Sequence, residues 1–162
     1  MNALKKIVLL ILYPILCGCL VLSLLVAKPS KQTDKSQTFR NKVNSDSSIT
    51  LNQTNSSVVF TEDLSSLRDP AFAACFDLTT EYTHFLEESV AFRNDDTAEL
   101  LQRYLEPYIY MSDGLDLMLQ ESKTAHCLVA INIRMDYDCV RDFSLLLLSP
   151  ESNKLYWFYC TS

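Results

Sequence analysis

The pattern of hydrophobic and polar positions divides the chain into three segments. Residues 7–27 carry no charged side chain, residues 28–57 are polar, and residues 58–162 mix apolar and polar positions in regular patterns. A helix over residues 7–27 would be about 31 Å long, which matches the hydrocarbon core of a bilayer. We therefore expect a membrane anchor in residues 1–27, a flexible linker in 28–57 and a folded domain in 58–162.

The linker prediction depends on the scarcity of large apolar residues in residues 28–57. Only four occur there, without periodicity: Phe39, Val43, Ile49 and Leu51. Such a segment buries too little surface to offset the entropy lost on ordering.

The domain begins with a pattern that is typical of a helix. Asp69 is an N-cap residue and Pro70 suits the first helical position, so a long helix is expected from there to about Arg93. Its largely apolar stripe recurs at spacings of three and four residues: Cys75, Leu78, Tyr82, Phe85, Ser89 and Phe92.

A second helix is predicted to begin near Asp96, which resembles a capping box with Glu99. Pro107 is expected to stop it, because proline lacks the amide proton that a continuing helix needs. The stretch over residues 112–122 fits either a short helix or a strand.

From Thr124 onward the period changes to two, which predicts strands over residues 124–137, 139–150 and 154–162. A turn is expected at Pro150. In the first strand one face is apolar: Cys127, Val129, Ile131, Ile133 and Met135. The prediction is an α+β domain in which a long helix and short helices pack on an antiparallel meander of about three C-terminal strands.

The last two predicted strands are apolar on both faces, which indicates that both faces must be covered. Either residues 108–122 fold over the second face, or another polypeptide completes the sheet by β-augmentation. On the second hypothesis the candidate partner-interface residues are Leu145, Leu147, Tyr156, Trp157, Phe158 and Tyr159.

Two other interpretations of the N-terminal segment compete with the anchor. Leu16-Cys17-Gly18-Cys19 resembles a lipobox, which would make Cys19 the lipidated residue. Ordinary cleavage after Ala27 is the other alternative, although Leu25 suits the position three residues before a cut poorly. The length of the uncharged run favours the anchor.

Cysteine usage and flanking charge disagree about the side of the membrane on which the domain lies. Lysines on both sides of the span, including Lys28, Lys31 and Lys35 after it, favour a cytosolic domain under the positive-inside rule. The four dispersed cysteines instead predict two disulfides in an oxidising compartment: Cys75, Cys127, Cys139 and Cys160. Cys75 is expected to pair with one of the other three, because Cys127 and Cys139 lie at opposite ends of the first hairpin. We therefore expect a single-pass membrane protein whose domain is exported to an oxidising compartment.

The charge of the domain argues against nucleic acid as a partner. Residues 58–162 carry seven basic and eighteen acidic side chains, a net charge of −11. Phosphate groups are repelled by such a surface.

No catalytic constellation is present, so we expect a protein that is not an enzyme, without cofactor, metal or small-molecule substrate. Asp136, Asp138 and Asp142 lack the glycine and the distal glutamate of a calcium loop. Glu81, His84 and Glu88 share a helical face, which makes His84 a candidate pH sensor; a surface histidine in an acidic field is the simpler interpretation.

The layout of the whole chain, from MNALKKIVLLILYPILCGC to KLYWFYCTS, resembles the companion proteins of ToxR-like membrane regulators. These are the ToxS type, and the PsaF and MyfF proteins are similar in size and arrangement. The resemblance implies a single-pass protein of the bacterial inner membrane with its domain in the periplasm, where it is a partner that stabilises the regulator and so promotes expression of adhesin or virulence genes.

A different class of function also fits the sequence. A small-ligand-binding module or secretion-apparatus subunit would line a pocket with Tyr82, Phe85, Trp157 and Tyr159. An envelope lipoprotein is the third hypothesis, and it depends on Cys19.

Overall fold

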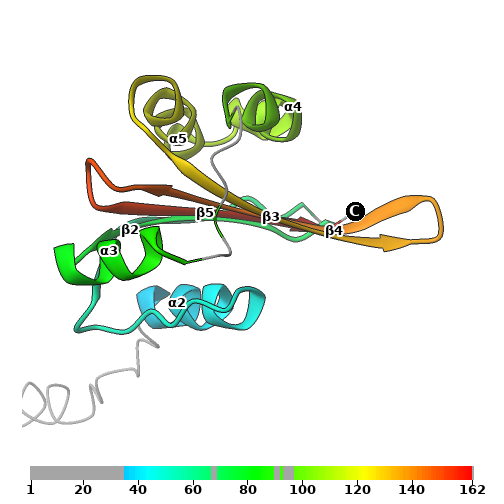
Figure 1. Ribbon diagram of the computed structural model, residues 1–162. Coiled ribbons are helices and arrows are strands. Elements are labelled where there is room, and N and C mark those ends of the chain that lie inside the picture. Colours follow the sequence, from blue (N-terminus) through cyan, green and yellow to red (C-terminus); the bar gives the residue numbers. More distant parts are fainter. Residues whose placement is uncertain (1–34, 67–68, 90–91, 93–96, 162) are drawn as a thin grey trace, which may run out of the picture. The chain divides into compact units, whose positions relative to one another are not determined.

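The computed structural model describes residues 35–66, 69–89, 92 and 97–161, which belong to one compact unit (Figure 1). Its elements are, in chain order, α2 (Lys35–Asp46), β1 (Ser56–Asp63), β2 (Ala71–Leu78), α3 (Thr80–Glu87), α4 (Thr97–Ile109), α5 (Asp113–Thr124), β3 (Leu128–Asp136), β4 (Cys139–Ser149) and β5 (Lys154–Thr161). The domain is of the α+β class.

The strands form a single antiparallel sheet in the order β1-β2-β5-β4-β3. The three predicted C-terminal strands and the turn between β4 and β5 are confirmed. The prediction that these three make up the whole sheet is wrong, because β1 and β2 extend it on the other side of β5. β5 is therefore the central strand.

Helices cover both faces of the sheet (Figure 1). On one face, α4 and α5 pack on a core that includes Leu105, Met118, Leu145 and Phe158. On the other face, α2 and α3 contribute to a second core with Phe76, Leu146, Leu148 and Trp157. The consecutive leucines of β4 alternate between the two cores, which explains why residues 145–148 are apolar on both faces.

The flexible-linker prediction is wrong for residues 35–57, and residues 28–34 lie outside the described part. Residues 35–46 form α2, which buries Phe39 and Val43 against the sheet. The buried Arg40 guanidinium donates to both the hydroxyl and the carbonyl oxygen of Ser56, at 3.2 and 2.9 Å, and so ties α2 to β1. Few apolar residues suffice to order this segment, because they pack against the apolar face of the sheet and need not form a core among themselves.

The predicted long helix from Asp69 to Arg93 is also wrong. Residues 71–78 form strand β2, with Ala73 and Cys75 in one core and Ala74 and Phe76 in the other. Backbone bonds to β1 and β5 on its two sides outweigh the helical preference of its alanines. A helix begins only at Thr80, where the hydroxyl of Thr79 accepts from the amide of Tyr82.

The second predicted helix is present as α4, but it continues through Pro107 to Ile109 instead of stopping there. Residues 112–122, whose sequence fits either a helix or a strand, belong to the helix α5, which is capped by the hydroxyl of Ser112. Within α5, Gly114 lies so close to the Phe60 ring of β1 that a Cβ atom would clash with it.

The candidate interface residues are enclosed by the domain itself, apart from the half-buried Tyr159. Leu145, Leu147 and Phe158 have no exposed surface, and Trp157 is 2% exposed. The hypothesis that a second molecule must cover this part of the sheet is therefore wrong. One face is covered by α4 and α5, and α5 lies largely within the residues 108–122 that the first alternative names; the other face is covered by α2 and α3, and α2 lies in the segment predicted to be a linker.

The membrane-anchor prediction for residues 1–27 lies outside the described residues, as does the lipidation candidate Cys19. Within residues 35–161, as far as they are described, no helix is both long enough and apolar enough to cross a bilayer.

Candidate functional site

The hairpin of β3 and β4 extends past the helices that cover the rest of the sheet (Figure 1). We call residues 132–142 of this hairpin the distal ribbon. Every residue from Asn132 to Arg141 is exposed. Four of the exposed large hydrophobic side chains lie here: Ile133, Met135, Tyr137 and Val140.

Three of these side chains form an apolar stripe on one face of the distal ribbon. Ile133 is two residues from Met135 along β3, and Met135 is directly opposite Val140 on β4. The same face of β3 carries Val129 and Ile131, which belong to the core under α4 and α5. The apolar stripe, defined as Ile133, Met135 and Val140, is thus the uncovered continuation of a covered face. Their exposed fractions are 40, 54 and 39%.

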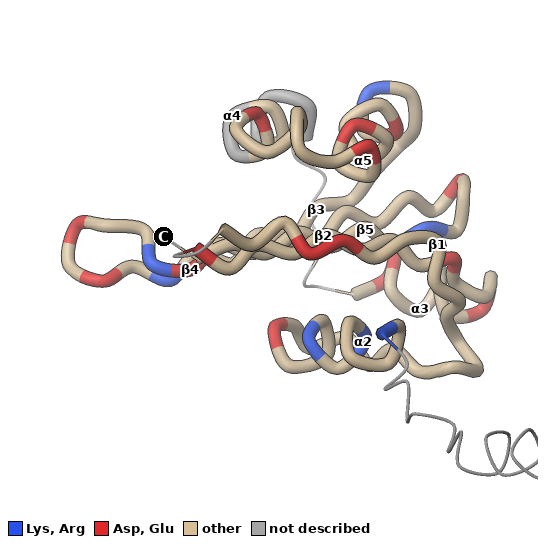
Figure 2. The backbone as a smooth tube through the Cα atoms, turned by 180° about the vertical axis from the view of Figure 1, so that it is seen from behind, with Lys and Arg blue, Asp and Glu red and all other residues tan. Residues whose placement is uncertain are grey.

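Charged residues of both signs lie along the distal ribbon beside the apolar stripe (Figure 2). Arg134 lies 3.3 Å from Asp142, and Arg141 lies 3.8 Å from Asp136. Both pairs bridge β3 and β4 and so favour the hairpin over a frayed chain, although exposed pairs of this kind each contribute less than about 1 kcal/mol. At the tip, Tyr137 adopts a positive φ of 55° and is 98% exposed.

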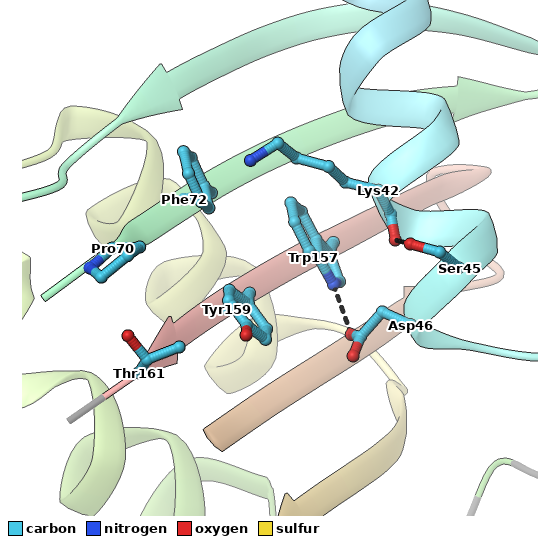
Figure 3. A pocket seen from close by; sticks show the side chains of 8 residues that line it. All are labelled: Lys42, Ser45, Asp46, Pro70, Phe72, Trp157, Tyr159 and Thr161. Carbon is cyan, nitrogen blue, oxygen red and sulfur yellow. Dashed lines mark hydrogen bonds between the residues drawn. The ribbon is translucent and has the colours of Figure 1, made fainter. Parts of the chain in front are cut away.

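A second feature lies on the opposite face of the sheet, between α2 and the strands β2 and β5 (Figure 3). This aromatic pocket has a volume of about 490 Å³. Its aromatic side chains are Phe72, Trp157 and Tyr159, and Tyr159 stacks on both of the others.

Polar groups of α2 form one wall of the aromatic pocket. The Lys42 ammonium lies 3.1 Å from the centroid of the Phe72 ring, and Asp46 accepts a 2.9 Å hydrogen bond from the indole of Trp157. Burial lowers the pKa of Lys42, although Asp63 nearby acts in the other direction. Pro70, Thr161 and Ser45 complete the lining.

The ligand-pocket hypothesis had placed four aromatic residues in one pocket, and the structure separates them into two pairs. Trp157 and Tyr159 line the aromatic pocket, whereas Tyr82 and Phe85 lie on α3 beside a different, more open hollow. Phe72 and Lys42 were missed, because both lie in segments whose secondary structure was predicted wrongly.

The disulfide prediction is contradicted: all four cysteines of the described part are free thiols. Strand register gives the reason. Cys75 is opposite Tyr156 on β5, whereas Cys160 is opposite Ala71, four residues further along β2. Four residues of strand span about 13 Å, whereas the Cα atoms of a disulfide lie within about 7 Å of each other.

The other two cysteines are equally remote. Cys139 lies four residues from Phe143, the β4 residue that is opposite Cys160. Cys127 directly precedes β3, at the end of the hairpin that is far from Cys139 and three strands from β2.

Burial also makes three of these thiols poor nucleophiles. It raises the pKa of Cys75 to about 12, and it raises the pKa of Cys127 and of Cys160 above the usual value. The nucleophilic form of cysteine is the thiolate, so these three are protonated and inert at neutral pH.

The candidate pH sensor His84 lies on the exposed side of α3. Its Nδ1 atom is 3.5 Å from Glu87, a residue that was not among the predicted partners, while Glu81 and Glu88 make no ion pair with it in the described part. Among the described residues, no cluster of three histidine, cysteine or acidic side chains is arranged to hold a metal ion.

No protein-family model, curated protein or solved structure matches this chain. The distal ribbon and the aromatic pocket are therefore interpreted from their geometry and chemistry.

Proposed function

We propose that the chain is a non-enzymatic, membrane-anchored protein whose distal ribbon binds a regulator of the ToxR-like type in the same membrane. The observation that carries the proposal is the apolar stripe of Ile133, Met135 and Val140, which continues a buried sheet face into solvent. Contiguous apolar surface with a polar rim is typical of protein–protein interaction sites.

The position of β3 suggests how the partner binds. β3 is an edge strand of the sheet, so its outer backbone amide and carbonyl groups face away from β4. A strand of the partner pairs with β3 along the distal ribbon, and its alternate side chains cover the apolar stripe. Backbone bonds give affinity in this mode, while the side-chain contacts give specificity.

The resemblance to ToxS-type companions supports the regulator as partner and the promotion of adhesin or virulence genes as the outcome. A shared membrane raises the effective concentration of the two proteins, so a modest contact area suffices. The export of the domain is part of this proposal, and it rests on the resemblance because the free thiols no longer support it.

The binding proposal is tested with the double substitution Ile133→Lys and Met135→Lys in the full chain, followed by co-purification of the regulator from membranes. The expected result is loss of the regulator with an unchanged melting temperature, because both side chains are exposed. Leu117→Lys is the matched control, since Leu117 is 53% exposed but lies on α5. Undiminished co-purification by the double variant would refute the proposal.

The side of the membrane is tested separately with Cys139, which is exposed in the distal ribbon. In a chain with Cys17 and Cys19 replaced by serine, a membrane-impermeant maleimide should label Cys139 in intact cells with a permeabilised outer membrane. Labelling that occurs only after lysis of the inner membrane would place the domain in the cytosol.

A further inference from the structure

We propose that the aromatic pocket binds a small aromatic carboxylate. Its volume of about 490 Å³ lies within the range of about 300–1,000 Å³ that is typical of small-molecule sites. Such sites combine apolar walls with a few polar groups, and this pocket has aromatic side chains beside one ammonium and one carboxylate (Figure 3).

Lys42 is the group that selects an anion. Its ammonium lies over the Phe72 ring and makes no ion pair within the described part of the chain. The attraction of an ammonium to a ring is weaker than a charge-assisted hydrogen bond to a carboxylate. A ligand carboxylate at Lys42 therefore replaces a weak contact with a strong one, at an ammonium that is already partly buried.

The remaining lining selects the uncharged part of the ligand. Phe72 and Trp157 stack on Tyr159 with interplanar angles of 19 and 15°, so an added ring finds aromatic surface beside it. Asp46 disfavours a second negative charge on the ligand, and its carboxylate accepts from a donor, as it does from the Trp157 indole. The preferred ligand has one carboxylate, one or two rings and at most a hydroxyl substituent.

This site is independent of the partner-binding proposal. The aromatic pocket lies on the face that α2 covers, whereas the apolar stripe lies on the face that α4 and α5 cover elsewhere. The two sites also share no residue, so each can be changed without altering the other.

The test uses the fluorescence of Trp157, the one tryptophan of the chain, which lines the aromatic pocket. The full chain is titrated with diphenylacetate and, separately, with the uncharged diphenylacetamide. The expected result is a saturable change in emission with the carboxylate. The amide should bind at least about tenfold more weakly.

Three variants identify the anchoring group. Lys42→Gln should lower the affinity for diphenylacetate about tenfold and leave the affinity for the amide unchanged, while Lys42→Arg should retain most of the binding. Lys35→Gln removes the same charge from the first turn of α2, outside the aromatic pocket, and should have no effect. The proposal is overturned by equal affinity for the acid and the amide, by equal effects of Lys42→Gln and Lys35→Gln, or by no saturable change in the unaltered chain.

Discussion

Both halves of the β3–β4 hairpin carry apolar side chains on the same face of the sheet, but these side chains are buried in the inner half and exposed in the outer half. In the inner half, Leu145 and Leu147 have no exposed surface, while in the distal ribbon Ile133 and Met135 are 40 and 54% exposed. The difference lies in α4 and α5, which cover the inner half and do not reach the outer half (Figure 1). Alternation therefore identifies the apolar face of a strand, but the elements around it decide whether that face stabilises the domain or is available to a partner.

The largest expected effect is in α2, which covers the opposite face of the sheet, where Leu146 and Leu148 of the inner half are buried. Val43→Asp should lower the free energy of unfolding by about 3–5 kcal/mol, because it places a charge in the fully buried contact between α2 and the sheet. Asn41→Asp introduces the same carboxylate on the exposed side of α2 and should have little effect. Urea unfolding measures both, and equal stability of the two variants would show that α2 does not cover the sheet.

The next comparison sets the two halves of the hairpin against each other directly. Leu147→Ala should cost about 2–5 kcal/mol through lost burial and the cavity that remains. Met135→Ala should stay within about 0.5 kcal/mol, because the side chain is exposed already. A large loss of stability in the Met135 variant would mean that the distal ribbon is folded into the domain core.

A third prediction compares a covered thiol with an exposed one through the pH dependence of stability. Cys75 has its pKa raised by burial from 9.0 to about 12, so the unfolded chain loses this proton first as the pH rises. Stability should therefore be unaffected by Cys75 below about pH 8 and should fall between about pH 9 and 12, by roughly 1–3 kcal/mol near pH 11. Denaturant midpoints across this range measure the slope.

Cys75→Ala should make that slope shallower, whatever it does to stability at neutral pH. Cys139→Ala, in the distal ribbon, should leave the slope unchanged. An identical slope in the unaltered chain and in the Cys75 variant would contradict the burial of this thiol.

The smallest perturbation is chemical labelling of the native thiols. In a chain with Cys17 and Cys19 replaced by serine, a thiol reagent should modify Cys139 quickly and Cys75 and Cys127 only after unfolding, since these two are buried. Mass spectrometry of the labelled peptides measures the order. Equally rapid modification of all three would show that the inner half is as open as the distal ribbon.

The sequence predicts those parts of the fold in which one pattern dominates. β3 alternates apolar and polar residues, and β4 and β5 carry short apolar runs that are bounded by turns, so no helical periodicity competes with the strand pattern. β2 could not be predicted in this way, because Cys75 and Leu78 also fit a helical stripe that continues into α3. Its strand conformation depends on pairing with β5, about eighty residues later in the chain.

The candidate sites were less accessible to prediction. The apolar face of β3 was predicted through Met135, but its exposure depends on where α4 and α5 end. The charged residues Arg134, Asp136 and Arg141 are the sequence feature that indicates this exposure, because a strand end covered by helices would not carry them. The aromatic pocket needs α2 above β2 and β5, a contact between segments that no local pattern relates.

The central position of β5 has a consequence for folding during synthesis. Within the part of the chain that the structure describes, the β1–β2 pair and the β3–β4 pair share no backbone ladder, and β5 joins them through residues 154–161. During synthesis the complete sheet can therefore form only after residues 154–161 have left the ribosome, and until then the two strand pairs are not joined. A truncated chain without residues 154–161 would contain two separate hairpins that lack the central strand, and cellular quality control would encounter it as an incompletely folded protein.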